Sequence, residues 1–264
     1  MLTLCAGVYY INMFNNNHIQ TTAYGILSSK VRDDFVVAQL SDLHEKSFGL
    51  HNHRLFHKVE ALRPDIIAIT GDLVAHEKQK TADTAYTYTL AKGLVKIAPC
   101  FFVTGNHERE FDAEITDALA RGGVTVIRGE MHTLQVGNTD VNISGIDDVT
   151  YGMEGIAQTC GSFVGKDGFN IFLTHQPQVY ELCLQNNIDL ILAGHTHAGQ
   201  IRIPKITEIY MSGQGWFPKY IQGEFTDGET TMIISRGLGA SGYPTFRLNN
   251  PPELVAVYVS PLKN

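Results

Sequence analysis

Residues 35–44 read FVVAQLSDLH, an apolar run that ends in an acid and an imidazole. The aromatic and β-branched residues at 35–40 predict a buried strand. Asp42 and His44 follow that strand and lie two residues apart, so an extended backbone would turn both side chains to one face. The segment therefore predicts a strand that presents two polar side chains at its carboxyl end.

Polar side chains also follow four further predicted strands, at residues 66–70, 101–104, 169–174 and 190–193. The groups are, in order, Gly71-Asp72, Gly105-Asn106-His107-Glu108, His175 and Gly194-His195-Thr196-His197. In open α/β sheets, ligands collect beyond the carboxyl ends of the strands. Five such coincidences indicate one shared site rather than five separate structural residues.

These segments contain carboxylate, amide and imidazole donors but no cysteine. Oxygen donors mixed with imidazole suit divalent metal ions better than a thiolate-bound structural metal. We expect two ions, with manganese first and zinc, iron or magnesium as alternatives.

Helical spacing alternates with the strands, at residues 54–62, 81–96, 113–121 and 179–185. Further strands are predicted at 124–127, 133–136, 141–144 and 254–259. Such alternation indicates a layered α/β sandwich. We expect one domain at 33–264, preceded by an N-terminal segment at 1–32.

The composition limits the class of protein. With 44% apolar residues, the 264-residue chain can form a sizeable core. A net charge of −7 argues against a nucleic-acid partner, which would favour a basic surface. The four cysteines form no CxxC pair, so we expect buried reduced thiols or at most one disulfide.

Residues 2–14 are mostly apolar, but they are fewer than the ~20 needed to span a bilayer. No lysine or arginine precedes them, so a signal peptide is not indicated. They read either as the remnant of a membrane anchor or as an opening strand. We expect membrane association, with a cytoplasmic protein as the alternative.

The motif set resembles the calcineurin-like metallophosphoesterase superfamily, whose pattern is DxH, GD, GNH[DE], H and GHxH. The resemblance implies a four-layer α-β-β-α sandwich, with two mixed sheets flanked by helices and the metal site at the strand carboxyl ends. It also implies that one ion is held by Asp42, His44, Asp72 and His197, and the second by Asn106, His175 and His195, with Asp72 bridging both. His107 resembles the catalytic imidazole of the family.

The chemistry expected from this arrangement is phosphoester hydrolysis. A metal-bridging hydroxide is the expected nucleophile, because metal binding can bring the pKa of water from ~15.7 to near 7. His107 would stabilise the phosphoryl group or protonate the leaving oxygen. A phosphomonoesterase or nucleotide phosphatase is an alternative, and a non-catalytic scaffold of the same fold is another.

The second motif departs from that of the protein phosphatases, which continues as GDxxDRG. Ala75 stands where the Asp would orient the catalytic imidazole, and His76 stands where the Arg would hold phosphate. A phosphoprotein substrate is therefore not expected. Glu108 is a candidate to orient His107.

The later part of the chain resembles a subgroup of bacterial, often membrane-associated phosphoesterases. The shared elements are HQP at 175–177, GHTHAGQ at 194–200, WFP at 216–218, RGLG at 236–239 and PE at 252–253. Members cleave phosphodiesters or pyrophosphates, some of them lipid-linked sugar nucleotides. A phosphoester substrate, in some members lipid-linked, is the partner this implies; the sequence specifies no oligomeric state.

Three residues are candidates for substrate contact. Arg236 and Arg247 could clamp a phosphate in bidentate fashion, or each could form a surface salt bridge. Trp216 could line the rim for an apolar substrate moiety, or pack in the core. The GLGASG run at 237–242 does not open a helix, since Tyr243-Pro244 follows, so we expect a loop over the metal site rather than a dinucleotide fingerprint.

Overall fold

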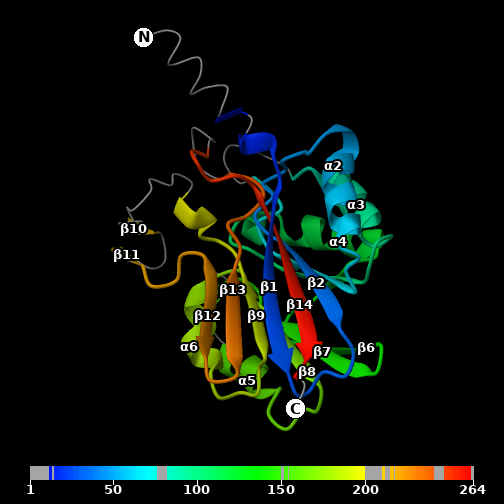
Figure 1. The fold of residues 1–264 in the computed structure, drawn as a ribbon. Coiled ribbons are helices and arrows are strands. Elements are labelled where there is room, and N and C mark those ends of the chain that lie inside the picture. The colour runs from blue at the N-terminus through cyan, green and yellow to red at the C-terminus, as the bar shows by residue number, and fades with distance from the viewer. Residues whose placement is uncertain are drawn as a thin grey trace.

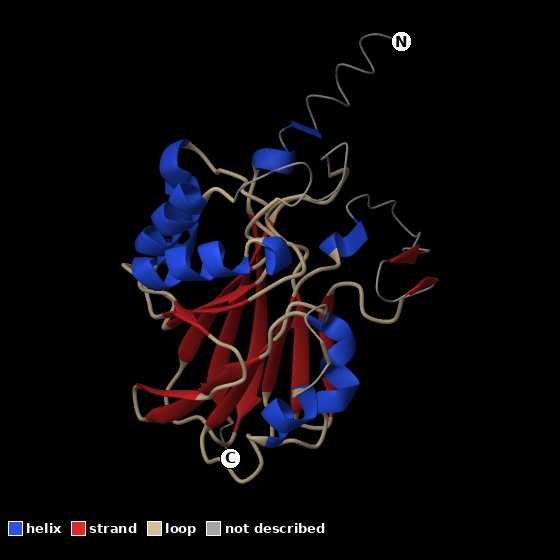
Figure 2. Cartoon of the chain, turned by 180° about the vertical axis from the view of Figure 1, so that it is seen from behind, coloured by secondary structure: helices blue, strands red, loops and turns tan. Residues whose placement is uncertain are grey.

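Two six-stranded sheets lie against each other at the centre of the molecule, and helices cover both outer faces (Figures 1 and 2). This computed structural model describes residues 12–13, 15–75, 82–149, 152–153, 155–199, 210–211, 215–216, 218–240 and 247–262. The arrangement is the four-layer α-β-β-α sandwich that the sequence predicts.

The first sheet has the order β1-β14-β2-β3-β4-β5. Its strands are β1 (Gln20–Ser28), β14 (Glu253–Pro261), β2 (Phe35–Leu40), β3 (Ile66–Thr70), β4 (Cys100–Val103) and β5 (Thr125–Val126). All neighbours are parallel except β14 and β2. Because β3 is buried along its whole length, its sequence is continuously apolar up to Thr70.

The N-terminal part of the chain belongs to this sheet. β1 pairs with β14 from Gln20 to Ser28, so the boundary expected at residue 33 falls inside the sheet. The sequence gives little sign of this pairing, because β1 lies at the edge and half of its residues face solvent.

The second sheet has the order β12-β13-β9-β8-β7-β6. Its strands are β12 (Gly223–Asp227), β13 (Thr230–Ile234), β9 (Leu190–Ala193), β8 (Phe169–Leu173), β7 (Thr139–Gly145) and β6 (His132–Val136). The four central strands are parallel, and antiparallel β12 and β6 close the edges. A separate two-stranded ribbon consists of β10 (Tyr210–Met211) and β11 (Gly215–Trp216).

A hydrophobic core fills the space between the two sheets. Phe35 of β2 meets Phe169 of β8 edge to face, with ring centroids 5.5 Å apart. Val103 and Leu173, at the ends of β4 and β8, belong to the same buried cluster. This packing holds the carboxyl ends of strands from both sheets at one edge.

Helices form the two outer layers (Figure 2). The first sheet is covered by α2 (His53–Ala61), α3 (Thr84–Leu94) and α4 (Asp112–Gly122). The second is covered by α5 (Ile156–Gly161) and α6 (Tyr180–Cys183). Helix α6 is shorter than the predicted 179–185, because Leu184 turns to an extended conformation with ψ 147°.

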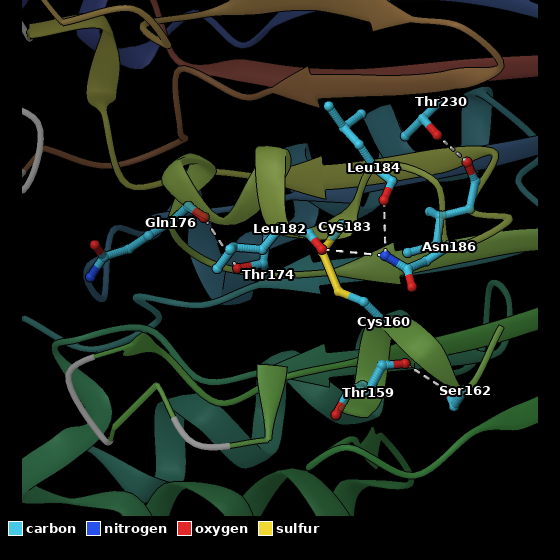
Figure 3. The surroundings of a disulfide bond; sticks show 11 residues. Thr159, Cys160, Ser162, Thr174, Gln176, Leu182, Cys183, Leu184, Asn186 and Thr230 are labelled. Atoms are coloured by element: carbon cyan, nitrogen blue, oxygen red, sulfur yellow. Dashed lines mark hydrogen bonds between the residues drawn. A yellow bond between two sulfur atoms is a disulfide. The ribbon is translucent and has the colours of Figure 1, made fainter. Parts of the chain in front are cut away.

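One disulfide joins the two helices on the second sheet (Figure 3). Cys160 in α5 and Cys183 in α6 are 23 residues apart, and their Cα atoms are separated by 5.3 Å. Cys100 is a buried free thiol. The sequence allows either reduced thiols or one disulfide, and the described part of the chain has one disulfide.

A buried glutamine links the two sheets just below the functional edge. Gln39 of β2 donates its side-chain amide to the Thr70 hydroxyl at 3.0 Å and to the Ala193 carbonyl oxygen at 2.8 Å. The ends of β2, β3 and β9 are thereby tied together where the polar motifs begin.

Candidate metal centre

The polar motifs leave their strands through left-handed turns, not through extended strand ends. φ is positive at Asp42 (52°), His44 (47°), Asp72 (54°), His195 (71°) and His197 (49°). The expectation that Asp42 and His44 share one face of an extended strand is therefore wrong. The side chains converge because each turn folds back over the sheet edge. Such backbone conformations cost about 1–3 kcal/mol each and concentrate at functional sites.

Two glycines press against Asp42, which is itself fully buried. A Cβ on Gly194 would lie 2.5 Å from Asp42 Oδ2, and one on Gly237 would lie 2.7 Å from Asp42 Cβ. The amides of Leu238 and Gly239 donate to the carbonyl oxygens of Ser41 and Asp42. The start of the glycine-rich run thus packs on the first motif, while residues 241–246 lie outside the described part of the chain.

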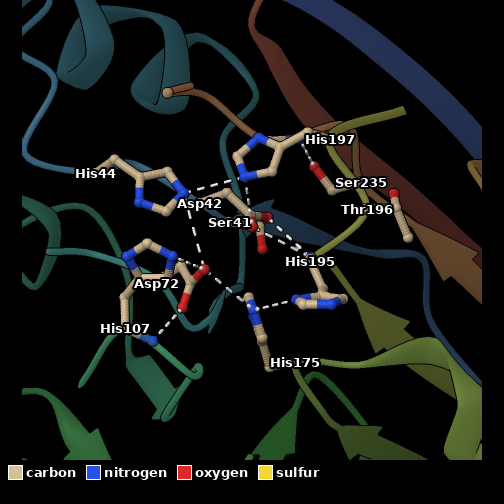
Figure 4. Close-up of polar contacts among 12 residues, drawn as sticks. Ser41, Asp42, His44, Asp72, His107, His175, His195, Thr196, His197 and Ser235 are labelled. Atoms are coloured by element: carbon tan, nitrogen blue, oxygen red, sulfur yellow. Dashed lines mark hydrogen bonds and ion pairs between the residues drawn. The ribbon is translucent and has the colours of Figure 1, made fainter. Parts of the chain in front are cut away.

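Four side chains from three motifs form a first donor group (Figure 4). The Nε2 atoms of His44 and His197 are 3.0 Å apart, and His197 Nε2 is 3.4 Å from Asp42 Oδ1. His44 Nε2 is 3.8 Å from Asp72 Oδ2. The donor atoms of Asp42, His44, Asp72 and His197 all lie within 4.8 Å of one another.

Asp72 also belongs to a second donor group, with His175 and His195. His175 Nε2 lies 3.3 Å from Asp72 Oδ2 and 3.2 Å from His195 Nδ1. Figure 4 shows Asp72 lying between the two sets of imidazoles. One carboxylate is thus shared by both groups, as the sequence analysis expects.

An orphaned amide oxygen supports the fit of this pocket to metal ions. Asn106 Oδ1 is buried and has no hydrogen-bond partner. A buried acceptor without a partner costs about 1–3 kcal/mol, so its placement needs a reason. A cation beside it supplies one, and the donor set of carboxylates, imidazoles and an amide oxygen is of the type that binds divalent ions.

Backbone carbonyls orient two of the imidazoles. His44 Nδ1 is 3.1 Å from the Val74 carbonyl oxygen, and His175 Nδ1 is 2.7 Å from that of Thr70. A carbonyl can only accept, so each Nδ1 carries a proton and each Nε2 is the nitrogen left to face a metal. Both carbonyls belong to β3 or the turn after it.

Burial and mutual charge shift the pKa values of the cluster. Burial raises the pKa of Asp42 to about 6 and lowers the pKa of His44 to about 4. Burial alone would raise the pKa of Asp72, but His175 holds it well below its usual range. Burial alone would lower the pKa of His175, but the Asp72 carboxylate raises it well above its usual range. A cation at this site would compete with protons for Asp42 and His175.

The comparison with known proteins agrees with this geometry. A two-sheet α/β sandwich with a buried Asp/His cluster at the strand ends defines a class of metal-dependent hydrolases. Residues 35–199 match the family model described as calcineurin-like phosphoesterase. The chain belongs to this family and is a metal-dependent phosphoesterase.

Bacterial relatives carry names of the same kind. The chain is 28% identical to the metallophosphoesterase YkoQ of Bacillus subtilis, over 83% of this chain and 81% of that protein. It is 27% identical to the phosphodiesterase YaeI of Escherichia coli, over 83% and 80% of the two chains. The Haemophilus influenzae NAD nucleotidase shares the fold with a TM-score of 0.53 and 15% identity, over 78% of this chain and 46% of that one.

Both arginines expected at the substrate are buried and bound within the protein. Arg236 pairs with Glu253 at 2.8 Å. Arg247 is fully buried and donates to the carbonyl oxygens of Arg236, Gly239 and Asn250. The alternative of surface salt bridges is wrong because neither residue is on the surface, and the contacts give both a structural role. Neither guanidinium is free for a phosphate in this structure.

One polar residue outside the predicted site supports the first donor group. Asn250 is buried, and its side-chain amide donates to the His197 carbonyl oxygen at 2.6 Å. It lies 53 residues from His197 in sequence, outside every motif, so no local pattern marks it. Trp216 is in β11, and its side chain, like all of His76, lies outside the described structure.

The close approach of Gly194 to Asp42 predicts the effect of one methyl group. Gly194→Ala should displace the Asp42 carboxylate and weaken Mn²⁺ binding on the order of tenfold or more, as loss of supporting contacts does at metal sites. Isothermal titration calorimetry measures the affinity. Gly161→Ala, where nothing lies within 4 Å of the added Cβ, is the matched control. Equal affinities in both variants would contradict the packing.

The raised pKa of Asp42, about 6, predicts a pH-dependent metal affinity. Below that value the carboxyl is protonated, and a cation must displace the proton. The rise in Tm caused by Mn²⁺ should therefore be large at pH 7.5 and shrink towards pH 5. Thermal denaturation with and without Mn²⁺ at both pH values tests this. A constant Tm rise would show that no ligand proton is displaced.

Proposed function

We propose that this protein hydrolyses phosphodiester or pyrophosphate bonds with two divalent metal ions. The observation that carries the proposal is the sharing of Asp72 by both donor groups. A carboxylate with two oxygens can hold two ions at the ~3.5–4 Å separation of two-metal sites.

In this proposal the two donor groups hold one ion each. The first ion takes Asp42, His44, Asp72 and His197, and the second takes Asp72, Asn106, His175 and His195. Two bound ions supply Lewis acidity towards the phosphoryl oxygens and activation of a water. Manganese is the first choice, and zinc, iron or magnesium fit the same donors.

His107 is the group we assign to the leaving oxygen. Its side chain is 16% exposed, against 3% for Asp72, so it faces the side from which substrate enters. Its backbone amide donates to Asp72 Oδ1 at 2.9 Å, and its Nε2 is 3.8 Å from Asp72 Oδ2. The ring also meets that of His44 edge to face at 4.6 Å. Held this way, the imidazole can carry a proton at Nε2 and donate it as the ester bond breaks.

The engagement of both arginines favours a diester over a monoester. A phosphomonoester is a dianion that a guanidinium can hold in bidentate fashion, but Arg236 and Arg247 are bound to internal partners. A diester carries one negative charge and needs less compensation. The E. coli relative YaeI is named a phosphodiesterase, which supports the same choice.

Substitution of Asp72, the shared carboxylate, and of His107, the proposed general acid, tests the mechanism. With Mn²⁺, the protein should cleave bis-p-nitrophenyl phosphate. Asp72→Ala should abolish most turnover, and His107→Ala should lower kcat by about 10²–10⁴-fold, the usual contribution of a general acid. His57→Ala, on the exposed side of α2, is the control. Wild-type rates in both site variants would refute the mechanism.

The same assay separates the competing activities. Faster cleavage of p-nitrophenyl phosphate than of the diester would favour a phosphomonoesterase. An inert protein without bound metal would favour a scaffold, although every expected ligand is present. Lipid-linked and sugar-nucleotide pyrophosphates are the first natural substrates to screen.

Membrane association is a further part of the proposal. Residues 2–14 lie almost wholly outside the described structure, in which no helix is long and apolar enough to cross a membrane. Asn16, just after them, donates to the Arg247 carbonyl oxygen at 3.3 Å and accepts from Lys46, two residues past His44. Asn16 therefore lies beside the first motif, on the side of the domain that carries the metal centre. This supports a substrate held at a lipid surface.

A flotation experiment checks this. The full chain should float with phosphatidylglycerol liposomes, whereas a variant lacking residues 1–14 should stay at the bottom of the gradient. Recovery of the full chain entirely in the soluble fraction would contradict membrane association and leave the hydrolytic mechanism untouched.

A further inference from the structure

Glu108 is the fourth residue of the third motif, and its side chain is fully buried. Its carboxylate accepts four backbone N–H groups. Oε2 accepts from Asp72 at 2.8 Å and Gly105 at 2.6 Å, and Oε1 accepts from Leu73 at 2.7 Å and Val74 at 3.2 Å. The carboxylate is thus enclosed by the amides of two metal-binding loops.

These contacts exclude the role expected for Glu108 from the sequence, which is to orient His107. An ionised carboxylate has about four acceptor positions, and four amides occupy them. Glu108 is therefore not the direct partner that orients the His107 imidazole. Successive backbone amides in such turns commonly form a concave anion site. Here a side chain of the protein occupies that site.

The four amides belong to the loops that carry the central metal ligands. Asp72 itself donates one, and Gly105 immediately precedes Asn106. The His107 amide closes the link from the other side by donating to Asp72 Oδ1. Two loops from adjacent strands, β3 and β4, are therefore joined through a single carboxylate, and the left-handed conformation of Asp72 is fixed by it.

We propose that Glu108 is a positioning residue that fixes the spacing of the Asp72 and Asn106 loops and strengthens metal binding without contacting metal or substrate. The effect on metal binding rests on the proposed two-ion function, whereas the effect on the loops does not.

Two substitutions of Glu108 separate the effect of its charge from the effect of its side-chain length. Glu108→Gln keeps the size but removes the charge and turns an NH₂ group towards two amide donors. Glu108→Asp keeps the charge but is one methylene shorter. We expect Mn²⁺ affinity to fall about 10–100-fold in the Gln variant, as for other supporting residues of metal sites, and less in the Asp variant. Glu114→Gln, on the exposed face of α4, is the matched control and should bind as wild type.

Hydrogen exchange in the metal-free protein gives a readout independent of activity. The amides of Leu73, Val74 and Gly105 should exchange faster in the Gln variant, while those of the central strand β8 stay protected. With saturating Mn²⁺, kcat for the model diester should fall and KM should change little, because Glu108 does not touch substrate.

The outcomes are distinct. Wild-type Mn²⁺ affinity and unchanged exchange in the Gln variant would overturn the proposal. If the Gln variant does not fold, the Asp variant provides the test. Wild-type affinity and unchanged exchange in the Asp variant would overturn the proposal. Reduced affinity and faster exchange at the three amides would support it. If the wild-type protein cleaves no diester, the proposed function is refuted. Faster exchange in the Gln variant would still support the positioning role in that case.

Discussion

The shared carboxylate of Asp72 is the constraint on which the site depends. It can belong to both donor groups only because the carboxyl ends of two sheets meet at one edge. Sheet-on-sheet packing around Phe35 and Phe169 brings these edges together, and Gln39 ties β2 and β3 to β9. The catalytic account therefore depends on the hydrophobic core between the sheets, although no core residue takes part in the chemistry.

This convergence costs stability. Five of the expected ligands adopt left-handed backbone conformations, and buried carboxylates and imidazoles face each other at 3–4 Å. Backbone contacts offset part of the cost: carbonyls of Thr70 and Val74 hold two imidazoles, and Asn250 holds the loop of His197. Bound cations would compensate the remaining charge. Metal binding at such a site would therefore add to folding stability.

Sequence reasoning succeeded where the signal was local. Each motif follows a short apolar run, and the five predicted strands appear as β2, β3, β4, β8 and β9. It failed where the deciding contact is distant. The pairing of β1 with β14 joins residues more than 230 positions apart. Arg247 was misassigned for a different reason, because its carbonyl acceptors lie only 3, 8 and 11 residues away. A guanidinium on a loop has the same sequence signature whether it faces phosphate or backbone carbonyls.

The sequence by itself determined the family, the layered α/β architecture and the set of side chains expected to bind metal, because hydrophobic periodicity and donor type are local features of a sequence. Only the tertiary structure decided how those side chains converge. The turns fold back with positive φ, and Glu108 is bound by four amides rather than by His107. The physical reason is that backbone amides and carbonyls are present at every residue, so their choice of partner becomes fixed only when distant loops pack together.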